Sequence, residues 1–491
     1  GTEDVGACKK GTHTCLPSGE GFGECAGEVI PTTEICSTPI DEGCDGPNPV
    51  ECPSLGHVWS KSFGFMNEDV TTGVVVDPAT NDIIATGYFR DTIDFGTGPM
   101  ASTGADDIFL VRFTAEGQIV WAKRFGDAAA QTARSIALDS TGAIYIAGDM
   151  AGSIDFGNGT PIMTSAGSDD AFVAKFDPSG TIVWSRLFGD AQTQGAKSIA
   201  VTPTDQVIVV GTYYGFIPLT GMELPSNNSS RDMFIIKLDP SGLDIGAKKY
   251  GGPSSDDMVD VAVDSAGAVV VTGQFLDTID FGPVGIYTSA GSNDAFVLKL
   301  DSNLTEQWVK VYGDMESQRG QSVAITPTDD VFVSGDFGGS ILLDDGTSIT
   351  VPAQERSLFL FALAPDGAMR WGKAAATVMT PLAQAALAVD PSSQSIVAAG
   401  YFGGTIDFGG GPLVATVFDA FVVKMGWDGS HISSRSFGSP AVDAFFDVDV
   451  SATGDIFIVG GHQGPIDFGG GELPASSGSN DVQALFVRLL P

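Results

Sequence analysis

A chain of 491 residues is long enough for several ordinary domains or for one large repeat array. Glycine (64) and proline (26) are plentiful, but 43% of the residues are hydrophobic, which excludes an intrinsically disordered chain. The 61 acidic and 24 basic residues give a formal net charge of −37, which argues against nucleic acid as a partner. Such acidity suits solubility in salty surroundings, or a partner that is a cation, a basic protein or a neutral glycan.

Residues 1–52 form a Cys-rich segment that contains every cysteine of the chain. The six are Cys8, Cys15, Cys25, Cys36, Cys44 and Cys52. An even number of cysteines in a short segment that is too small to bury a core predicts three disulfides and an oxidising compartment. A zinc site is the alternative, but the spacings lack a C-x₂-C pair and only His13 lies among the cysteines. The sequence contains no stretch of 18 apolar residues, so no membrane-spanning helix is predicted. Gly1 is expected to be a mature start or the start of a piece of a longer precursor.

Beyond the Cys-rich segment, one motif recurs along the rest of the chain: a Trp, a basic residue two positions on, then an aromatic residue and a Gly. Clear copies are WSKSFG (59–64), WAKRFG (121–126), WSRLFG (184–189) and WVKVYG (308–313), and degraded copies are GAKKYG (246–251), WGKAAA (371–376) and SSRSFG (433–438). Successive copies are 62 or 63 residues apart. Seven copies at so even a period predict seven equivalent structural units.

Each period holds four runs that are typical of strands. The first is small and apolar, as in SIALD near Ile136, and the second ends in a Gly-rich turn. The third is exemplified by DAFVAKF at Asp170, and the fourth is the Trp run. Turn sequences such as DSTG (139–142) and DPSG (177–180) separate them. Residues 53–491 are therefore predicted to form an all-β, seven-bladed β-propeller of four-stranded antiparallel blades, with the first run innermost.

The two ends of the repeat region are complementary. The chain enters the first period at a fourth run, His57 to Phe63, and stops at Pro491 just after a third run, ALFVRLL. The last unit therefore lacks its outer strand, and the N-terminal strand is spare. Pairing of the two is expected to close the ring and to remove two open sheet edges.

The repeat resembles the seven-bladed β-propeller (SBBP) repeats of bacterial secreted and cell-surface proteins. The matching features are the Asp-x-x-Gly turns, the F-V-x-K-[FL] run, the D-P-S-G turn and the aromatic-Gly ending, over residues 57–491. The run DPSGTIVW (177–184) also resembles the propeller repeats of quinone-dependent dehydrogenases. The Cys-rich segment is weakly similar to Cys-rich metal-binding repeats of bacterial surface proteins, but of their acidic run only Asp41, Glu42 and Asp45 remain.

Basic residues gather in two columns of the repeat. Seven lie in the Trp run, at Lys61, Lys123, Arg186, Lys248, Lys310, Lys373 and Arg435. Six lie in the third run, at Arg112, Lys175, Lys237, Lys299, Lys424 and Arg488. A charge that recurs in nearly every unit indicates a structural device, and ion pairs are expected with the repeated carboxylates Asp107, Asp170, Asp232, Asp294 and Asp419. Seven equivalent ligand sites are the alternative.

The recurrent IDFG turns hold a further set of carboxylates, at Asp94, Asp155, Asp280, Asp407 and Asp467. An Asp in a Gly-rich turn is expected to accept a hydrogen bond from the backbone two residues on. Calcium binding would need carboxylates spaced as D-x-D-x-D-G, which this sequence lacks.

Any binding site is expected on one end of the ring, which we call the loop face, where the links between second and third strands and the links between blades emerge. These links are long and differ between blades, whereas the links at the opposite end are tight turns. The candidate binding residues are Glu68, Asp69, Asp256, Asp257, Glu316, Asp443, Asp447 and Asp449. Asp447 and Asp449 alternate along an innermost strand, so they either bind a cation in the central channel or form a solvated channel wall.

Catalytic signatures such as G-x-S-x-G, H-E-x-x-H or a P-loop do not occur in a suitable context, and no cofactor is expected. The favoured hypothesis is a non-enzymatic extracellular or bacterial cell-surface protein with a structural or interaction role. It includes a self-assembling filament component in which the Cys-rich segment docks onto a neighbour. A glycan-binding, lectin-like adhesin and a propeller enzyme, either quinone-dependent or active on polysaccharides, are the alternatives.

Overall fold

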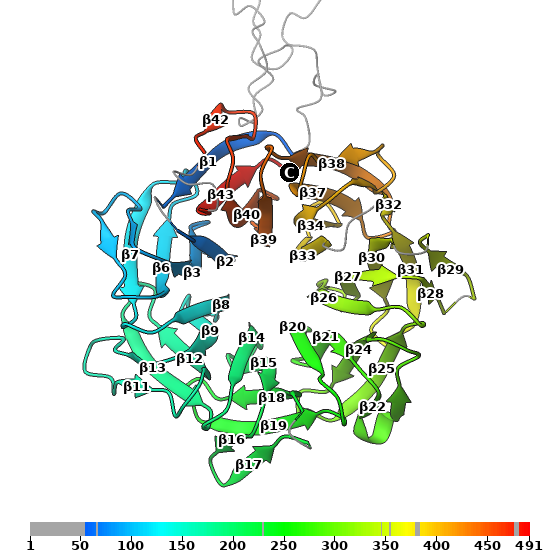
Figure 1. Cartoon of the computed structure of the whole chain (residues 1–491), viewed down its shortest axis with the longest axis horizontal. Coiled ribbons are helices and arrows are strands. Elements are labelled where there is room, and N and C mark those ends of the chain that lie inside the picture. The colour runs from blue at the N-terminus through cyan, green and yellow to red at the C-terminus, as the bar shows by residue number, and fades with distance from the viewer. Residues whose placement is uncertain are drawn as a thin grey trace, which may run out of the picture.

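The computed structural model describes residues 55–64, 67–227, 230–344, 346–352, 355–378, 383–475 and 481–491, and for 376–378 and 383 only the backbone. Seven four-stranded antiparallel sheets stand around a central channel like the blades of a propeller (Figure 1). The Cys-rich segment, with its six cysteines and the disulfides expected there, lies outside the described residues. Within the described ranges, no helix is long and apolar enough to cross a membrane.

Every blade runs from an innermost strand at the channel to an outermost strand at the rim. Blade 1 is β2 (Val70–Val76), β3 (Ile83–Phe89), β6 (Asp107–Phe113) and β7 (Ile119–Phe125), and blade 2 is β8 (Gln131–Leu138), β9 (Ile144–Met150), β12 (Asp170–Phe176) and β13 (Ile182–Phe188). Blade 3 is β14 (Gln194–Val201), β15 (Val207–Tyr213), β18 (Asp232–Leu238) and β19 (Asp244–Tyr250), and blade 4 is β20 (Asp257–Val263), β21 (Val269–Phe275), β24 (Asp294–Leu300) and β25 (Glu306–Tyr312). Blade 5 is β26 (Gln318–Ile325), β27 (Val331–Gly338), β30 (Arg356–Leu363) and β31 (Met369–Ala374), and blade 6 is β33 (Ala383–Asp390), β34 (Ser395–Phe402), β37 (Asp419–Gly426) and β38 (His431–Phe437). Blade 7 is β39 (Asp443–Val450), β40 (Ile456–His462), β43 (Gln483–Leu489) and β1 (His57–Phe63). The predicted seven-bladed, all-β propeller is confirmed, including the innermost place of the first run.

A small sheet interrupts the link between the second and third strands of each blade. These rim sheets are β4 (Thr92–Ile93) with β5 (Met100–Ala101), β10 (Ser153–Ile154) with β11 (Met163–Thr164), β16 (Phe216–Leu219) with β17 (Met222–Pro225), β22 (Thr278–Asp280) with β23 (Ile286–Thr288), β28 (Ser340–Leu342) with β29 (Ser348–Thr350), β32 (Ala376–Val378) with β35 (Thr405–Asp407) and β36 (Leu413–Val414), and β41 (Ile466–Asp467) with β42 (Glu472–Leu473). A 3₁₀ turn, Gly282–Val284, precedes β23. Sequence analysis expected long links here that differ between blades, and it did not predict these small sheets. The turn carboxylates act as predicted, since Asp155 Oδ1 accepts the Gly157 N–H at 2.7 Å.

The N-terminal strand closes the ring. β1 pairs antiparallel with β43, with Ser60 opposite Val487 and Phe63 opposite Ala484, and so supplies the outer strand that blade 7 lacks (Figure 1). This confirms the predicted closure. Each blade is buried on both faces against its neighbours, which is why third strands such as β18 and β24 are buried at every residue and read as nearly continuous apolar runs.

The Trp of one blade and the turn glycine of the next form an interlocking pair. Gly242 has a φ of +87° and lies over Trp184, where a Cβ would come within 2.9 Å of the indole. The Trp184 Nε1–H donates to the Pro240 carbonyl of the same turn at 3.1 Å. The turn glycine and the Trp run therefore recur together, because the turn of one blade packs onto the Trp of the preceding blade wherever that Trp is present.

The expected partners of the two basic columns were wrong, because no ion pair among the described residues joins a cation of either column to one of the five expected carboxylates. The third-strand cations pair with carboxylates at or near the turn between the first and second strands, as in Lys175–Asp139 (3.0 Å), Lys299–Asp264 (2.8 Å) and Lys424–Asp390 (3.0 Å). Asp170 lies five residues from Lys175 on one extended strand, which separates the two by about 16 Å at roughly 3.3 Å per residue. Of the expected carboxylates Asp107 makes an ion pair, but with Arg124, which belongs to neither column.

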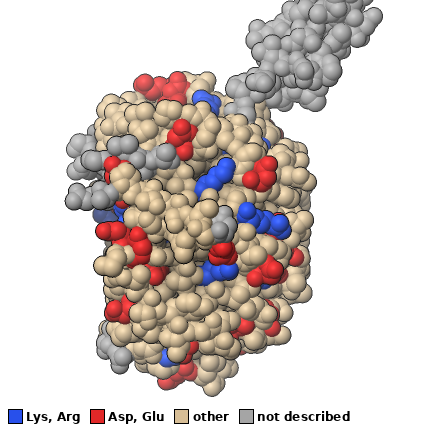
Figure 2. Space-filling model, turned by 90° about the vertical axis from the view of Figure 1, so that its right-hand side faces the viewer, with Lys and Arg blue, Asp and Glu red and all other residues tan. Residues whose placement is uncertain are grey.

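The carboxylates that begin the third strands support the blade's own loops instead. Asp170 Oδ2 accepts the Ala166 N–H at 2.9 Å, and Asp232 Oδ2 accepts the Asn227 N–H at 2.7 Å. A Cβ on Gly189 would come within 2.4 Å of the Asp170 carboxylate. The aromatic-Gly ending of the Trp run is therefore a packing requirement. On the side of the ring that carries β28 to β31, basic side chains lie dispersed among acidic ones (Figure 2).

Candidate functional site at the channel mouth

The innermost strands share a β-bulge at one level of the channel. The pairing register shifts there by one residue in β2, β8, β14, β20, β26 and β39, whereas β33 pairs without a shift. A bulge adds an unpaired residue and redirects its side chain. The added residues and Gln384 of β33, together called the mouth ring, are Thr72, Arg134, Lys197, Val259, Gln321, Gln384 and Phe446.

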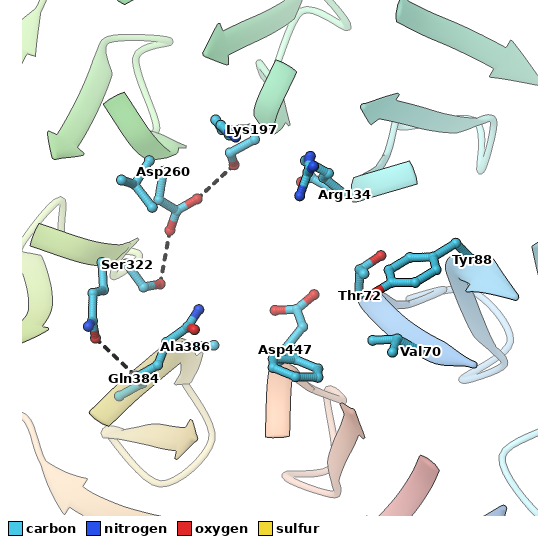
Figure 3. A pocket seen from close by; sticks show the side chains of 16 residues that line it. Val70, Thr72, Tyr88, Arg134, Lys197, Asp260, Ser322, Gln384, Ala386 and Asp447 are labelled. Carbon is cyan, nitrogen blue, oxygen red and sulfur yellow. Dashed lines mark hydrogen bonds between the residues drawn. The ribbon is translucent and has the colours of Figure 1, made fainter. Parts of the chain in front are cut away.

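The mouth ring lines a cavity of about 370 Å³ at the loop-face end of the channel (Figure 3). Val70 and Tyr88 contribute to its wall beside Thr72, and Asp260 and Asp447 lie one residue beyond the bulges. A second cavity of about 410 Å³ lies at the opposite end, among tight turns that include Pro203. The backbone of the mouth repeats from blade to blade, but its side chains differ in charge, size and polarity.

Asp260 connects three blades beneath the mouth ring. Its carboxylate accepts the hydroxyl hydrogens of Ser198 at 2.7 Å and Ser322 at 2.9 Å, and the backbone N–H of Val323 at 2.9 Å (Figure 3). Burial raises the pKa of Asp260. Because its oxygens accept these hydrogen bonds, Asp260 joins its own blade to the two neighbouring blades.

Asp447 and Asp449 occupy the seam where blade 7 meets blade 1. Asp447 Oδ2 accepts the Val74 N–H at 2.8 Å, and Asp449 Oδ2 accepts the Val76 N–H at 2.7 Å. Burial raises the pKa of Asp447 to about 8, with Asp449 and Asp260 adding to the rise, and raises that of Asp449 to about 6. Asp447 lines the channel as predicted, but both carboxylates join the two ends of the ring.

Three more of the predicted binding residues occupy one buried column at the entrance of the innermost strands. Asp256 accepts the N–H groups of Gly252 at 2.8 Å and Leu276 at 3.1 Å, Asp443 accepts that of Ser439 at 2.6 Å, and Asp69 accepts that of Arg90 at 3.2 Å. Burial raises the pKa of Asp256 to about 7 and that of Asp443 to about 6. Gln131, Gln194 and Gln318 make equivalent bonds in other blades, for example Gln194 Oε1 with the Asp190 N–H at 3.1 Å. The column holds the loops in place.

The remaining predicted residues lie apart from one another on the loop face. Asp257 receives hydrogen bonds from Arg231 Nη2 at 2.6 Å and Gln274 Nε2 at 3.1 Å. Glu68 accepts the Tyr88 hydroxyl hydrogen at 3.2 Å, and Glu316 is exposed. Among the described residues, no group of three or more His, Cys, Asp and Glu side chains has the geometry to hold a metal ion.

A cluster of cations at the mouth was missed by sequence analysis. Arg134, Lys197 and Arg231 line one cavity of about 160 Å³ between blades 2 and 3. Each lies outside the two basic columns. Arg134 and Lys197 occupy the same repeat position in adjacent blades, and Arg356 occupies the repeat position of Arg231. The signal in the sequence was therefore two cations one repeat period apart on innermost strands, but their place at the mouth depends on the bulges.

The opposite side of the mouth is aromatic. Tyr401 lies 6.4 Å from Phe418 and 6.2 Å from Phe446 between ring centroids, with interplanar angles of 81° and 74°. These three residues are called the aromatic rim. Val417 and Val442 beside it are 44% and 37% exposed, and a backbone bridge joins Val442 to Phe418. The mouth is thus basic on one side and apolar on the other.

Comparisons with known proteins show distant similarity. No family model matches the chain. An uncharacterized WD repeat-containing protein of Acanthamoeba polyphaga mimivirus is 24% identical over 193 residues, which are 36% of this chain and 13% of that protein. The regulatory protein FlaEY of Caulobacter vibrioides is 23% identical over 232 residues, 45% of this chain and 24% of that protein. The chain therefore spans less than a quarter of the length of the curated relatives it matches.

The similarity to solved structures is also distant. Sqt1 from Chaetomium thermophilum matches with a TM-score of 0.43 and 9% identity, over 83% of this chain and 97% of that one. The polysaccharide lyase Uly1 matches with a TM-score of 0.46 and 10% identity, over 86% of this chain and 90% of that one. The fold assignment rests on the strand pairing described above.

Proposed function

We propose that the chain is a non-enzymatic interaction propeller that binds a protein partner at the mouth on its loop face. The mouth ring is the observation that supports this. A bulge recurs in six blades and places one side chain of each at the channel entrance, yet the six side chains are all different. A rigid repeated backbone that displays varied side chains suits recognition of an asymmetric partner.

Two further features support a protein as the partner. The mouth combines cations with exposed apolar side chains, which is typical of protein-binding surfaces. A curated relative is named for WD repeats, which are propeller repeats. The acidic composition and the clustered cysteines support a secreted or cell-surface location. The similarity of the repeat to SBBP repeats is consistent with that location.

The proposed function is tested by blocking the mouth. Gln384→Trp adds bulk in the mouth ring, and Thr204→Trp is the matched change at an exposed turn of the opposite face. The 491-residue chain and both variants are immobilised and exposed to envelope and secreted proteins of the producing cell. We expect the wild type and Thr204→Trp to retain one protein stoichiometrically, and Gln384→Trp to retain at least about 10-fold less of it. Equal retention by Gln384→Trp, or no stoichiometric partner, contradicts the proposal.

A self-assembly role for the Cys-rich segment is the finer form of this proposal. Docking of the segment onto a second copy would be a head-to-tail contact, which forms a filament when it does not close. Light scattering of the full chain against a chain that starts at Pro53 tests it. Larger species in the full chain alone support assembly, and two monomers at high concentration exclude it.

A further inference from the structure

Arg134, Lys197 and Arg231 converge from adjacent blades. Arg134 is the bulge residue of β8, Lys197 that of β14, and Arg231 immediately precedes β18. All three line the 160 Å³ cavity, and Arg134 and Lys197 also face the channel cavity (Figure 3). At about 30 Å³ per water molecule, the smaller cavity has room for about five waters, which is enough space for a carboxylate group.

Each of the two arginines is held in place by a carboxylate. Arg134 donates from Nε and Nη2 to Asp149, the latter bond at 3.2 Å. Arg231 Nη2 donates to Asp257 at 2.6 Å, and its buried Nε has no hydrogen-bond partner among the described residues. A guanidinium has five donors, so each arginine keeps donors for a further acceptor.

Lys197 has no counter-ion. Within the described residues its ammonium makes no ion pair or hydrogen bond, although the chain carries 61 acidic residues. Burial and the neighbouring Arg134 lower the pKa of Lys197, while Asp149 and Asp257 act in the opposite direction. A half-buried ammonium between two guanidinium groups is stabilised by an anion that enters the cavity.

Two carboxylates line the same cavity and must be included in its charge. Asp149 is paired with Arg134. Burial raises the pKa of Asp169, and Asp149 adds to the rise while Arg134 opposes it. With three cations and two carboxylates, the lining of the cavity has an excess of cations over carboxylates. This excess favours one incoming carboxylate.

The aromatic rim favours a polypeptide over a sugar acid as the source of that carboxylate. Tyr401 meets Phe418 and Phe446 at near-right angles, so the three rings do not form a flat stacking platform. The exposed valines beside them extend an apolar surface. Such a surface packs against aliphatic or aromatic side chains.

We propose that the cavity between blades 2 and 3 binds the side-chain carboxylate of an acidic protein segment, with Lys197 and the two arginines as its ligands. This inference rests on the proposed function and names the chemistry of the partner. Apolar side chains of the same segment pack on the aromatic rim. By binding one carboxylate, this cavity, called the carboxylate cavity, fixes where the segment lies across the mouth.

The experiment uses the full chain, calorimetry and an N-acetylated pentaglutamate peptide. The salt concentration is about 0.1 M, where a Debye length of about 10 Å screens the repulsion that arises from the chain's net charge of −37. We expect pentaglutamate to bind, pentaglutamine not to bind, and Lys197→Gln to weaken pentaglutamate binding at least about 10-fold. The matched control is Lys123→Gln, which removes a half-buried lysine from the outer strand β7. This control should leave the affinity unchanged. Added salt should weaken binding because the contact is ionic.

Three outcomes overturn the inference: no pentaglutamate binding, equal affinity in Lys197→Gln, or an oligogalacturonate that binds through Lys197 when pentaglutamate does not. The last would identify a polysaccharide ligand. Arg134→Gln provides a second variant and should also weaken binding. If Gln384→Trp abolishes partner retention but Lys197→Gln leaves both partner and pentaglutamate binding intact, the proposed function stands and the carboxylate cavity is wrong.

Discussion

At the scale of single residues, the ring is held together by carboxylates whose pKa values are shifted in opposite directions. Asp139 and Asp390 lie at turns where hydrogen bonds and a lysine hold the pKa of each at about 2, against the effect of burial. Asp447 and Asp449 lie in the seam, where burial is not offset and the pKa rises. The first pair stabilises the fold when charged, and the second pair is tolerated best when protonated.

Stability is therefore expected to fall on both sides of a mildly acidic optimum. The folded protein binds more protons at Asp447 than the unfolded chain between about pH 4 and pH 8, so this contribution is lost as the pH rises through about 8. The contribution of Asp139 and Asp390 is lost as the pH falls from about 4 toward about 2. Denaturant unfolding across this range measures both limbs.

Asp447→Asn isolates the alkaline limb. It should reduce the decline in the free energy of unfolding between about pH 5 and pH 8, a decline of at most about 1.4 kcal/mol per pH unit for one group. Glu223→Gln, at an exposed position on the rim, is the control and should leave the slope unchanged. An unchanged slope in Asp447→Asn would show that the seam does not titrate as described.

Burial determines how much an ion pair contributes to the free energy of unfolding. The Lys424–Asp390 pair has side chains 4% and 0% exposed, whereas Arg370 of the Arg370–Asp330 pair is 49% exposed. Lys424→Ala leaves a buried carboxylate without its cation and should lower the free energy of unfolding by about 3 kcal/mol or more. Arg370→Ala should cost less than about 1 kcal/mol. Similar losses in chemical denaturation would contradict this ranking.

At the scale of elements, the repeated turns do more than reverse the chain. Gly142 and Gly242 have nearly the same φ, +78° and +87°, but only Gly242 lies against a Trp of the preceding blade. Gly142→Ala should cost about 1 kcal/mol of backbone strain. Gly242→Ala should cost clearly more, because a Cβ would come within 2.9 Å of Trp184. Equal losses would show that the interlock adds nothing to stability.

The closing strand is the second element whose removal has a defined consequence. Deletion of residues 1–64 leaves the edge of β43 unpaired, whereas deletion of residues 1–54 keeps β1. The longer deletion should lower the melting temperature by at least several degrees and cause association through the open edge. Thermal unfolding and light scattering distinguish the two. A monomer with unchanged melting after the longer deletion would show that β1 is dispensable.

Sequence periodicity predicted the features that repeat from blade to blade. The number of blades, the strand order and the spare first strand followed from evenly spaced motifs and from an incomplete last unit. The partners of Lys175 and its equivalents did not follow, because the carboxylate at the start of the same run recurs in most repeats but lies at the far end of the strand. Burial also changed the meaning of Asp256 and Asp443, which looked like binding residues and instead bond to their own loops.

At the scale of the whole molecule, the repeat and the departures from it have separate tasks. Residues that recur in most blades build the ring, through Trp–Gly contacts, buried ion pairs and turn carboxylates. Residues that occur once gather at one mouth, because the bulge in each innermost strand directs them there. Arg134 and Lys197 are 63 residues apart in the chain but line one cavity, and that proximity arises only when adjacent blades stand side by side. Because this spacing is one repeat period, the sequence places the two residues on adjacent blades, but only the bulges bring both side chains to the mouth.

Site-specific photo-crosslinking tests the central claim most directly. A benzoylphenylalanine replaces Val259, which lines the mouth, or Thr328, which is exposed on a turn of the opposite face. The full chain carrying either replacement is illuminated in the presence of the cell's envelope and secreted proteins. We expect Val259→benzoylphenylalanine to crosslink one protein through a segment rich in Asp and Glu, and the Thr328 replacement to crosslink none. A partner captured from Thr328, or none captured from Val259, would contradict binding at the mouth.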